Sequence, residues 1–242
     1  MVAAGLWGLL GASSLVLGAV VGLRAPLARR WVALLMAFGS GALISALAYD
    51  LAQEAFSTGG TGALATGLAA GALTFFIGNT LIHRSGGHRR GGKVKSPDGN
   101  GPAIVLGALL DGIPESVVLG STLLGGATIS ISFLAAVFIS NVPESLSAAA
   151  DLRREGHEAG WILRLWVLVA LVSGVAAAAG YALLGAMGAS VLVPFVQAFA
   201  AGAILTLLAD TMIPEAFEEG GPLVGLATVF GFALAFLLSN AG

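Results

Sequence analysis

The sequence contains no cysteine, and only 10% of its 242 residues are charged. Without thiols there are no disulfides and no thiolate ligands, so any bound metal must be held by oxygen or imidazole groups. The hydrophobic fraction of 57% and the mean hydropathy of +0.95 are far above the values of soluble domains, and they argue against a soluble protein. The sequence therefore predicts a protein whose surroundings are lipid.

Apolar stretches close to 20 residues long, enough to cross a hydrocarbon core, recur along the chain. They predict an all-α membrane protein, with one transmembrane domain over residues 1–242 and no soluble domain. The first stretch is interpreted as a helix and not a signal peptide, because its arginines follow the apolar run. The eight predicted spans are residues 3–23, 31–54, 61–83, 102–123, 128–150, 160–186, 189–216 and 222–240.

The basic residues indicate the orientation of these spans. All eleven Lys and Arg residues lie in or beside the first, third and fifth connections, at residues 24–30, 84–95 and 153–164. The positive-inside rule then places these connections in the cytoplasm and both termini outside it. A missed or extra helix would have put basic residues on both sides. The abundance of Ala, Gly, Val and Arg favours a bacterial plasma membrane.

The third connection, over residues 84–101, is rich in glycine and basic residues. This composition predicts a flexible cytoplasmic loop. Two histidines, His83 and His88, stand at its start. They are interpreted either as solvated loop residues or as a weak site at which metal ions are sensed or released.

An internal repeat links the second and seventh spans. Ala37-Phe38 and Gly41-Ala42, followed by Glu54-Ala55-Phe56, recur 161 positions later as Ala198-Phe199, Gly202-Ala203 and Glu215-Ala216-Phe217. The predicted topology points these two spans in opposite directions. An inverted repeat of helices 1–3 and 6–8 around helices 4 and 5 is therefore expected, and such repeats are typical of secondary transporters.

Acidic residues inside the spans call for an explanation, because a charge at the bilayer centre costs at least about 2.5 kcal/mol on insertion scales. Asp111 and Glu115 are four residues apart in the fourth span and share a face. Ser140, Asn141 and Glu144 do the same in the fifth span. We expect these two oxygen-bearing faces to meet and form a binding site.

The two faces also share a Pro-Glu pair, at Pro114-Glu115 and Pro143-Glu144. Proline removes a helical hydrogen bond and frees a carbonyl that can serve as an extra ligand. No Lys or Arg lies near these acids in the sequence, so protons or a bound metal ion must compensate their charge. The alternative is that the pairs merely kink the helices while the acids stay neutral and hydrogen-bonded.

These two motifs resemble the paired His-Asn-x-Pro-Glu signatures of the ZIP (Zrt/Irt-like) family of metal transporters. The likeness extends to eight helices, a histidine-containing third connection and a seventh span running from Ala200 through Pro214-Glu215. The resemblance implies transport of zinc, iron or manganese into the cytoplasm. It also implies that Glu115 and Glu144 bridge the metal positions.

The departures from the family pattern concern the ligands. Asp111 and Gly112 stand where the family has His and Asn, and Ser140 stands where it has His. The family's Ser-Gly-x-x-Glu-Pro of helix six is reduced to Ser173-Gly174 followed by alanines. The predicted site is thus reduced and all-oxygen, with Asp111, Glu115, Asn141, Glu144 and Ser140 as ligands. Oxygen ligands suit Mn²⁺ or Mg²⁺ at least as well as zinc.

Four further acids are expected along the route of the ion. Asp50 and Glu54 are four apart near the outer end of the second span, where they would concentrate cations. Glu54 is equally well interpreted as a solvated helix end. Asp210 and Glu215, in the seventh span, are expected to pass an ion or a proton inward.

Other functions were weighed against metal transport. A ZIP-like protein that only senses metal would explain the missing ligands. An intramembrane aspartyl protease would use Tyr49-Asp50, but the sequence has no Gly-x-Gly-Asp partner motif. A carrier of organic solutes would be expected to show an intramembrane Lys or Arg. We expect no enzyme activity, no prosthetic group and no nucleic-acid partner, and the small-residue helix faces permit a homodimer.

Overall fold

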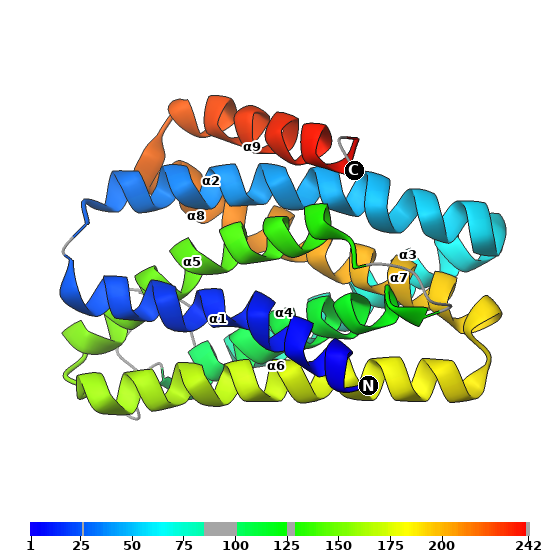
Figure 1. Ribbon diagram of the computed structural model, residues 1–242. Coiled ribbons are helices and arrows are strands. Elements are labelled where there is room, and N and C mark those ends of the chain that lie inside the picture. Colours follow the sequence, from blue (N-terminus) through cyan, green and yellow to red (C-terminus); the bar gives the residue numbers. More distant parts are fainter. Residues whose placement is uncertain (26, 85–100, 125–128, 241–242) are drawn as a thin grey trace.

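A computed structural model describes residues 1–25, 27–84, 101–124 and 129–240, and these form helices without any strand. The helices pack lengthwise into one bundle (Figure 1). The π-helical segments η1 and η3 interrupt two of the longer runs. In chain order the elements are α1 (Val2–Arg24), α2 (Arg29–Ala46), η1 (Leu47–Ala52), α3 (Gln53–Arg84), α4 (Gly101–Ser121), α5 (Ile131–Arg154), α6 (Ala159–Met187), α7 (Ala189–Leu207), η3 (Leu208–Met212), α8 (Ile213–Gly220) and α9 (Leu223–Ser239).

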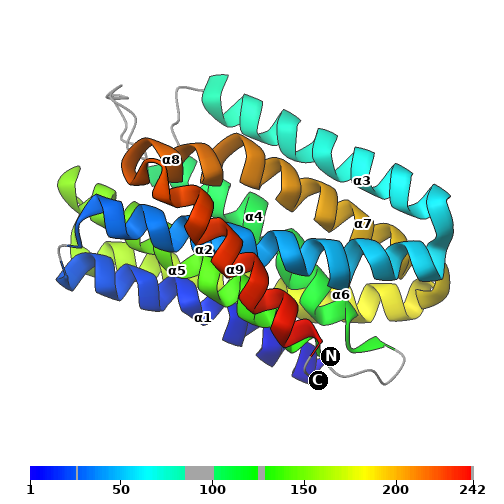
Figure 2. The same ribbon diagram turned by 90° about the horizontal axis from the view of Figure 1, so that it is seen from above.

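Six helical runs in the described residues are long and apolar enough to cross a membrane, and α9 is a shorter apolar helix. One run, Arg29–Ile82, covers both the second and the third predicted span. The two predicted spans correspond to the two arms of this run, because the chain doubles back sharply between α2 and α3 (Figure 2). The turn is at Gly60. Gly60 has φ 72° and ψ −177°, a conformation that glycine adopts without a steric penalty.

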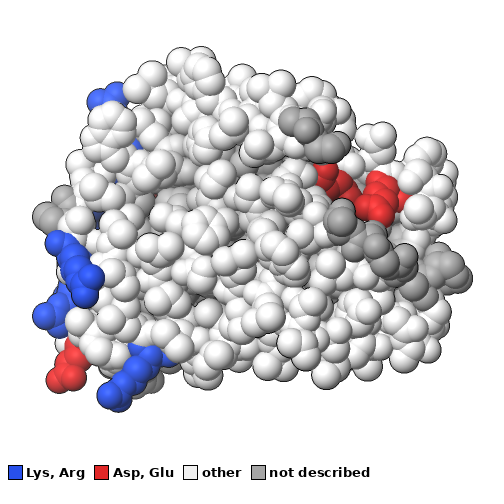
Figure 3. Space-filling view, in the orientation of Figure 1, with Lys and Arg blue, Asp and Glu red and all other residues white. Residues whose placement is uncertain are grey.

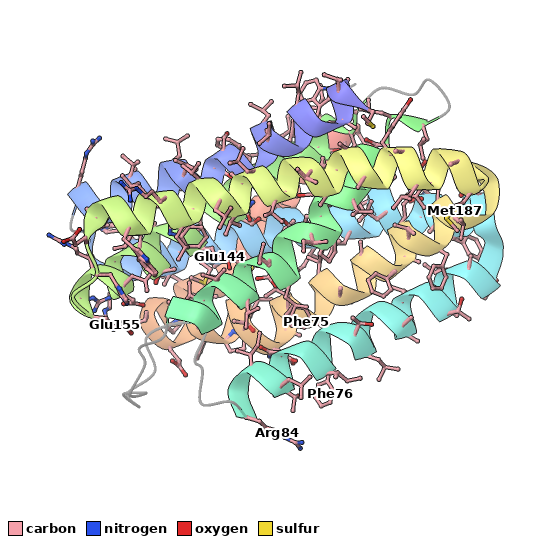
Figure 4. All side chains as sticks on the ribbon, turned by 90° about the horizontal axis from the view of Figure 1, so that it is seen from below. Phe75, Phe76, Arg84, Glu144, Glu155 and Met187 are labelled. Atoms are coloured by element: carbon pink, nitrogen blue, oxygen red, sulfur yellow. The ribbon has the colours of Figure 1, made fainter. Side chains whose placement is uncertain are left out.

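The buried side chains form two apolar clusters. One lies among α1, α4, α5 and α6 and is centred on Trp166 and Ile162. The other joins α2, α3, α7 and α9 with parts of α4 and α5. Outward-facing side chains are apolar as well: Phe75 is 1% exposed, whereas its neighbour Phe76 is 56% exposed (Figure 4). An apolar exterior on a packed bundle is what a lipid surrounding requires.

Helices α2 and α9 approach each other through glycines. A Cβ atom on Gly41 would collide with the backbone carbonyl of Thr228. A Cβ atom on Gly231 of α9 would likewise collide with the carbonyl of Phe38. Such close contact of backbones is available only to glycine and is a common means of packing helices in lipid.

The pair α3 and α7 is packed in the same manner. Gly71 of α3 faces the carbonyl of Phe199, and Gly202 of α7 faces the carbonyl of Leu68. Each helix of the pair thus supplies one glycine and one backbone carbonyl, as α2 and α9 do.

The described Arg residues mark one end of the bundle. Figure 3 shows the basic atoms of one face at a single end, where Figure 1 places the turns between α1 and α2 and between α5 and α6. Both chain termini lie away from that end (Figure 1). The loop predicted over residues 84–101 lies outside the described residues, except for Arg84 and Gly101, which belong to helices.

Candidate metal site

The five predicted ligands are all buried in α4 and α5. Their exposed fractions are below one tenth, although four of them carry a carboxylate or an amide. Glu144 lies inside the bundle, between the end marked by Glu155 and the end marked by Met187 (Figure 4). The individual values are 5% for Asp111, 3% for Glu115, 1% for Ser140, 7% for Asn141 and 8% for Glu144.

Glu115 is crowded by two other acids, because the carboxylates of Asp111 and Glu144 lie close enough to repel its charge. Its Oε2 atom is buried and accepts no hydrogen bond from the described residues. A buried carboxylate oxygen without a donor costs free energy, so native proteins seldom leave one bare.

The polar groups of α5 are partly engaged within their own helix. The Ser140 hydroxyl donates to the carbonyl of Val137 at 3.0 Å, and it keeps its lone pairs for a ligand. The backbone of Ser140 packs directly against Gly39 of α2. This contact fixes the side of α5 that turns toward α2.

The carboxylates do not form a ready-made metal cage. Among the described residues, no group of three or more His, Asp or Glu side chains could hold a metal ion as arranged. A cation at Glu115 and Glu144 would therefore need neutral oxygens or water as its remaining ligands. Hard divalent cations, Mg²⁺ above all, commonly keep several waters when they bind proteins.

Helix α6 brings a buried hydroxyl beside the α4 motif. Ser173 of α6 is 2% exposed, and its Oγ atom would lie 3.3 Å from a Cβ atom on Gly112. The hydroxyl therefore stands beside the residue that follows Asp111 in the motif. In the sequence, Ser173-Gly174 is the remaining part of the family's helix-six motif. That pair is the only sequence feature that pointed to Ser173.

A cavity of about 440 Å³ opens near the Arg-bearing end of the bundle. It lies between α2, α5 and α8, and Glu215 is among its lining residues. Two ion pairs border it: Arg29 binds Glu219 at 2.9 Å, and Arg154 binds Asp151. Glu215, predicted to lie on the ion route, thus faces a water-accessible space.

At the opposite end, the two predicted route residues differ in environment. Asp50 accepts hydrogen bonds from the hydroxyls of Ser130, Ser132 and Ser239. Glu54 is exposed beside a cavity of about 350 Å³. Exposure fits the interpretation of Glu54 as a solvated helix end.

The remaining predicted route residues are Asp210, His83 and His88. Asp210 is exposed on η3. The side chain of His83 and the whole of His88 lie outside the described residues.

Comparison with known proteins gives one relevant relative. An Arabidopsis thaliana protein named "Putative zinc transporter" is 26% identical to this chain over 209 residues. The chain is similar to a plant transporter. The alignment covers 85% of the chain but only 33% of the relative, so the chain spans about a third of that protein's length. No protein-family model matches the chain.

This likeness agrees with the resemblance to the ZIP family that the motifs of α4 and α5 indicated. It also agrees with a membrane transporter and not an enzyme. Because the relative is a plant protein, it gives no support to the bacterial origin expected from composition.

Proposed function

We propose that the protein carries a divalent metal cation across the membrane, with Glu115 and Glu144 as its central ligands. The observation that carries this proposal is the bare Oε2 atom of Glu115, buried among apolar helices beside two further carboxylates. A cation passing between α4 and α5 would supply the charge and the coordination that this oxygen lacks.

No basic side chain of the described residues is placed to supply that charge. The described arginines lie at or near the ends of the helical runs, whereas Glu115 lies well inside α4. Protons are the alternative compensation when no metal is bound. These arginines are Arg24, Arg29, Arg30, Arg84, Arg153, Arg154 and Arg164.

The donor set defines the class of metal. Carboxylate, amide and hydroxyl oxygens from Asp111, Asn141 and Ser140 complete a set without sulfur or imidazole. Zn²⁺, Mn²⁺ and Fe²⁺ all accept such ligands, and zinc is the metal in the name of the plant relative.

An inverted repeat would supply the alternating access that a carrier needs. Three observations support it. The glycines Gly41 and Gly202 are 161 positions apart and make equivalent contacts with the backbone of a partner helix. The segments η1 and η3 begin at Leu47 and Leu208, again 161 positions apart. Finally, the pairs α2 with α9 and α3 with α7 exchange the same kind of contact. Counting the two arms that meet at Gly60 separately, and α9 as a span, gives the eight helices that the repeat requires.

The distribution of arginines sets the direction of transport in this proposal. The positive-inside rule puts the Arg-bearing end, and with it the cavity lined by Glu215, in the cytoplasm. Both termini then lie outside. Ions released into this cavity would enter the cytoplasm.

Uptake into proteoliposomes tests the proposal. Wild-type protein should accumulate at least one of Zn²⁺, Mn²⁺, Fe²⁺ and Cd²⁺, and Glu115→Ala and Glu144→Ala should reduce uptake about a hundredfold, to background. Glu158→Ala is the matched control, because Glu158 is exposed at the N-cap of α6 and does not belong to the predicted ligand set. Wild-type uptake that persists in both site variants would refute the assignment. Binding without uptake would favour a metal sensor.

A further inference from the structure

Asp50 is held by three hydroxyl groups from two other parts of the chain. Ser239, at the end of α9, donates to its Oδ1 atom at 2.8 Å. Ser130 donates to Oδ2 at 3.1 Å, and Ser132 donates to the same oxygen. Both carboxylate oxygens are therefore occupied by protein donors.

The two serines on Oδ2 belong to the beginning of α5. Ser130 is the N-cap of this helix and accepts a hydrogen bond from the backbone N–H of Phe133 at 3.1 Å. Ser132 lies in the first turn and is 8% exposed. Asp50 thereby fastens the outer end of α5, the helix that carries Asn141 and Glu144, to the α2–η1 helix.

Helices α2 and α5 are arranged differently along their length. Their outer ends are joined at Asp50, and Gly39 touches the backbone of Ser140 about midway. Beyond that contact the helices part, because Met36 of α2 and Leu146 of α5 line the inner cavity. The pair is thus closed at the outer end and open at the inner end.

We propose that Asp50 is the outer latch of the transporter: its bonds to Ser130 and Ser132 hold α5 against α2 and favour the inward-open arrangement. Opening toward the outside must break these bonds while the inner cavity closes. Asp50 is then a positioning residue and not an ion ligand. The proposal rests on the proposed transport function for its role in a cycle, but its conformational claim can be tested separately.

The chemistry of the contact suits a latch. Hydroxyl-to-carboxylate hydrogen bonds are charge-assisted and stronger than those between neutral groups. They are also short-range, so a small displacement of α5 releases them together. A two-state contact of this kind can set the ratio of two arrangements of the bundle.

Thiol labelling tests the latch, because the protein has no cysteine of its own. One reporter is Ala136→Cys, a 1% exposed residue of α5 one turn inward from Ser132. The other is Ser147→Cys, which lines the inner cavity. Each is placed in the full chain in lipid nanodiscs, where a water-soluble maleimide reaches both faces of the membrane.

In the Asp50→Ala background we expect labelling of Ala136→Cys to become about tenfold faster, the effect of losing a charge-assisted hydrogen bond. Labelling of Ser147→Cys should become slower, because the population shifts away from the inward-open arrangement. The double variant Ser130→Ala/Ser132→Ala should give the same two changes and leaves Asp50 in place in case Asp50→Ala fails to fold.

Ser239→Ala is the matched control. It removes one hydrogen bond from the same carboxylate but none to α5, so both labelling rates should stay close to wild type. Equal effects of Ser239→Ala and Asp50→Ala would show that Asp50 anchors α9 and would overturn the latch. Unchanged rates in both the Asp50→Ala and the double-serine backgrounds would also overturn it. Absence of metal uptake by wild type would refute the transport proposal without altering either labelling result.

Discussion

Two carboxylates within the long helical runs, Asp50 and Glu115, are treated in opposite ways by the fold. Three serine hydroxyls surround Asp50. Glu115 is 3% exposed, keeps a bare Oε2 atom and is crowded by Asp111 and Glu144. The difference indicates that the hydrogen-bonding capacity of Asp50 is filled by the protein itself. The Oε2 atom of Glu115, in contrast, has no such partner and is open to a bound ion or proton.

The largest expected effect is the stabilisation of the folded protein by a bound metal ion. A ligand at 100 times its dissociation constant stabilises a protein by about 2.7 kcal/mol. We therefore expect Mn²⁺ or Zn²⁺ to raise the thermal midpoint of the wild-type protein in detergent, and Asp50→Asn to keep this rise. Glu115→Ala should lose it. A rise that survives in Glu115→Ala would place the ion elsewhere.

Stability without metal should change in opposite directions at the two positions. Asp50→Ala removes charge-assisted hydrogen bonds and should lower the free energy of unfolding by about 2 kcal/mol. Glu115→Gln removes the free-energy cost of burying this acid, either as a repelled charge or through proton uptake on folding, and should raise the thermal midpoint. Thermal unfolding in metal-free buffer measures both. Asp210→Asn, at an exposed position of η3, serves as the control with little effect. A lower midpoint for Glu115→Gln would contradict the contrast.

The ligand type should decide the preference among metals. Introducing imidazole by Asp111→His and Ser140→His should shift relative uptake from Mn²⁺ toward Zn²⁺ by about tenfold, because zinc accepts nitrogen ligands more readily than manganese does. Competition uptake with both metals present measures the ratio. An unchanged ranking in the double variant would count against these two positions as ligands.

The smallest effect is expected at the Arg-bearing end of the bundle. Arg29 and Glu219 form an ion pair, but their side chains are 63% and 45% exposed. Exposed pairs contribute at most about 1 kcal/mol, so Glu219→Gln should leave the thermal midpoint nearly unchanged. A loss of stability as large as that of Asp50→Ala would contradict the distinction between the half-buried, hydrogen-bonded Asp50 and an exposed carboxylate.

Patterns within single helices were readable from the sequence. Hydropathy and length predicted an all-helical membrane protein, and the spacing of Asp111 with Glu115 predicted a shared buried face. The reversal at Gly60 falls between the predicted spans 31–54 and 61–83, in a stretch rich in Ser, Thr and Gly. The sequence did not predict that helix continues up to this turn on both sides. The long helix and the turn differ there by the dihedral angles of one residue.

Contacts between distant segments were outside the reach of sequence reasoning. Asp50 was predicted to attract cations because of its place near the end of a span. Its partners Ser130, Ser132 and Ser239 were not predicted, because nothing along the chain marks them. These partners lie 80 to 189 positions away. Ser173 was likewise noticed only as part of a degraded motif.

The sequence by itself determined that the protein lies in lipid, that it is helical and that its acids share helix faces. The first two follow from composition and the length of the apolar stretches, and the third from the 3.6-residue period of a helix. Only the tertiary structure decided which carboxylate is satisfied and which is left bare. That decision depends on how helices far apart in the chain approach one another, at Gly39 against Ser140 and at Asp50 against the start of α5. Hydrogen bonds reach about 3 Å, and only the assembled bundle brings the groups within that distance.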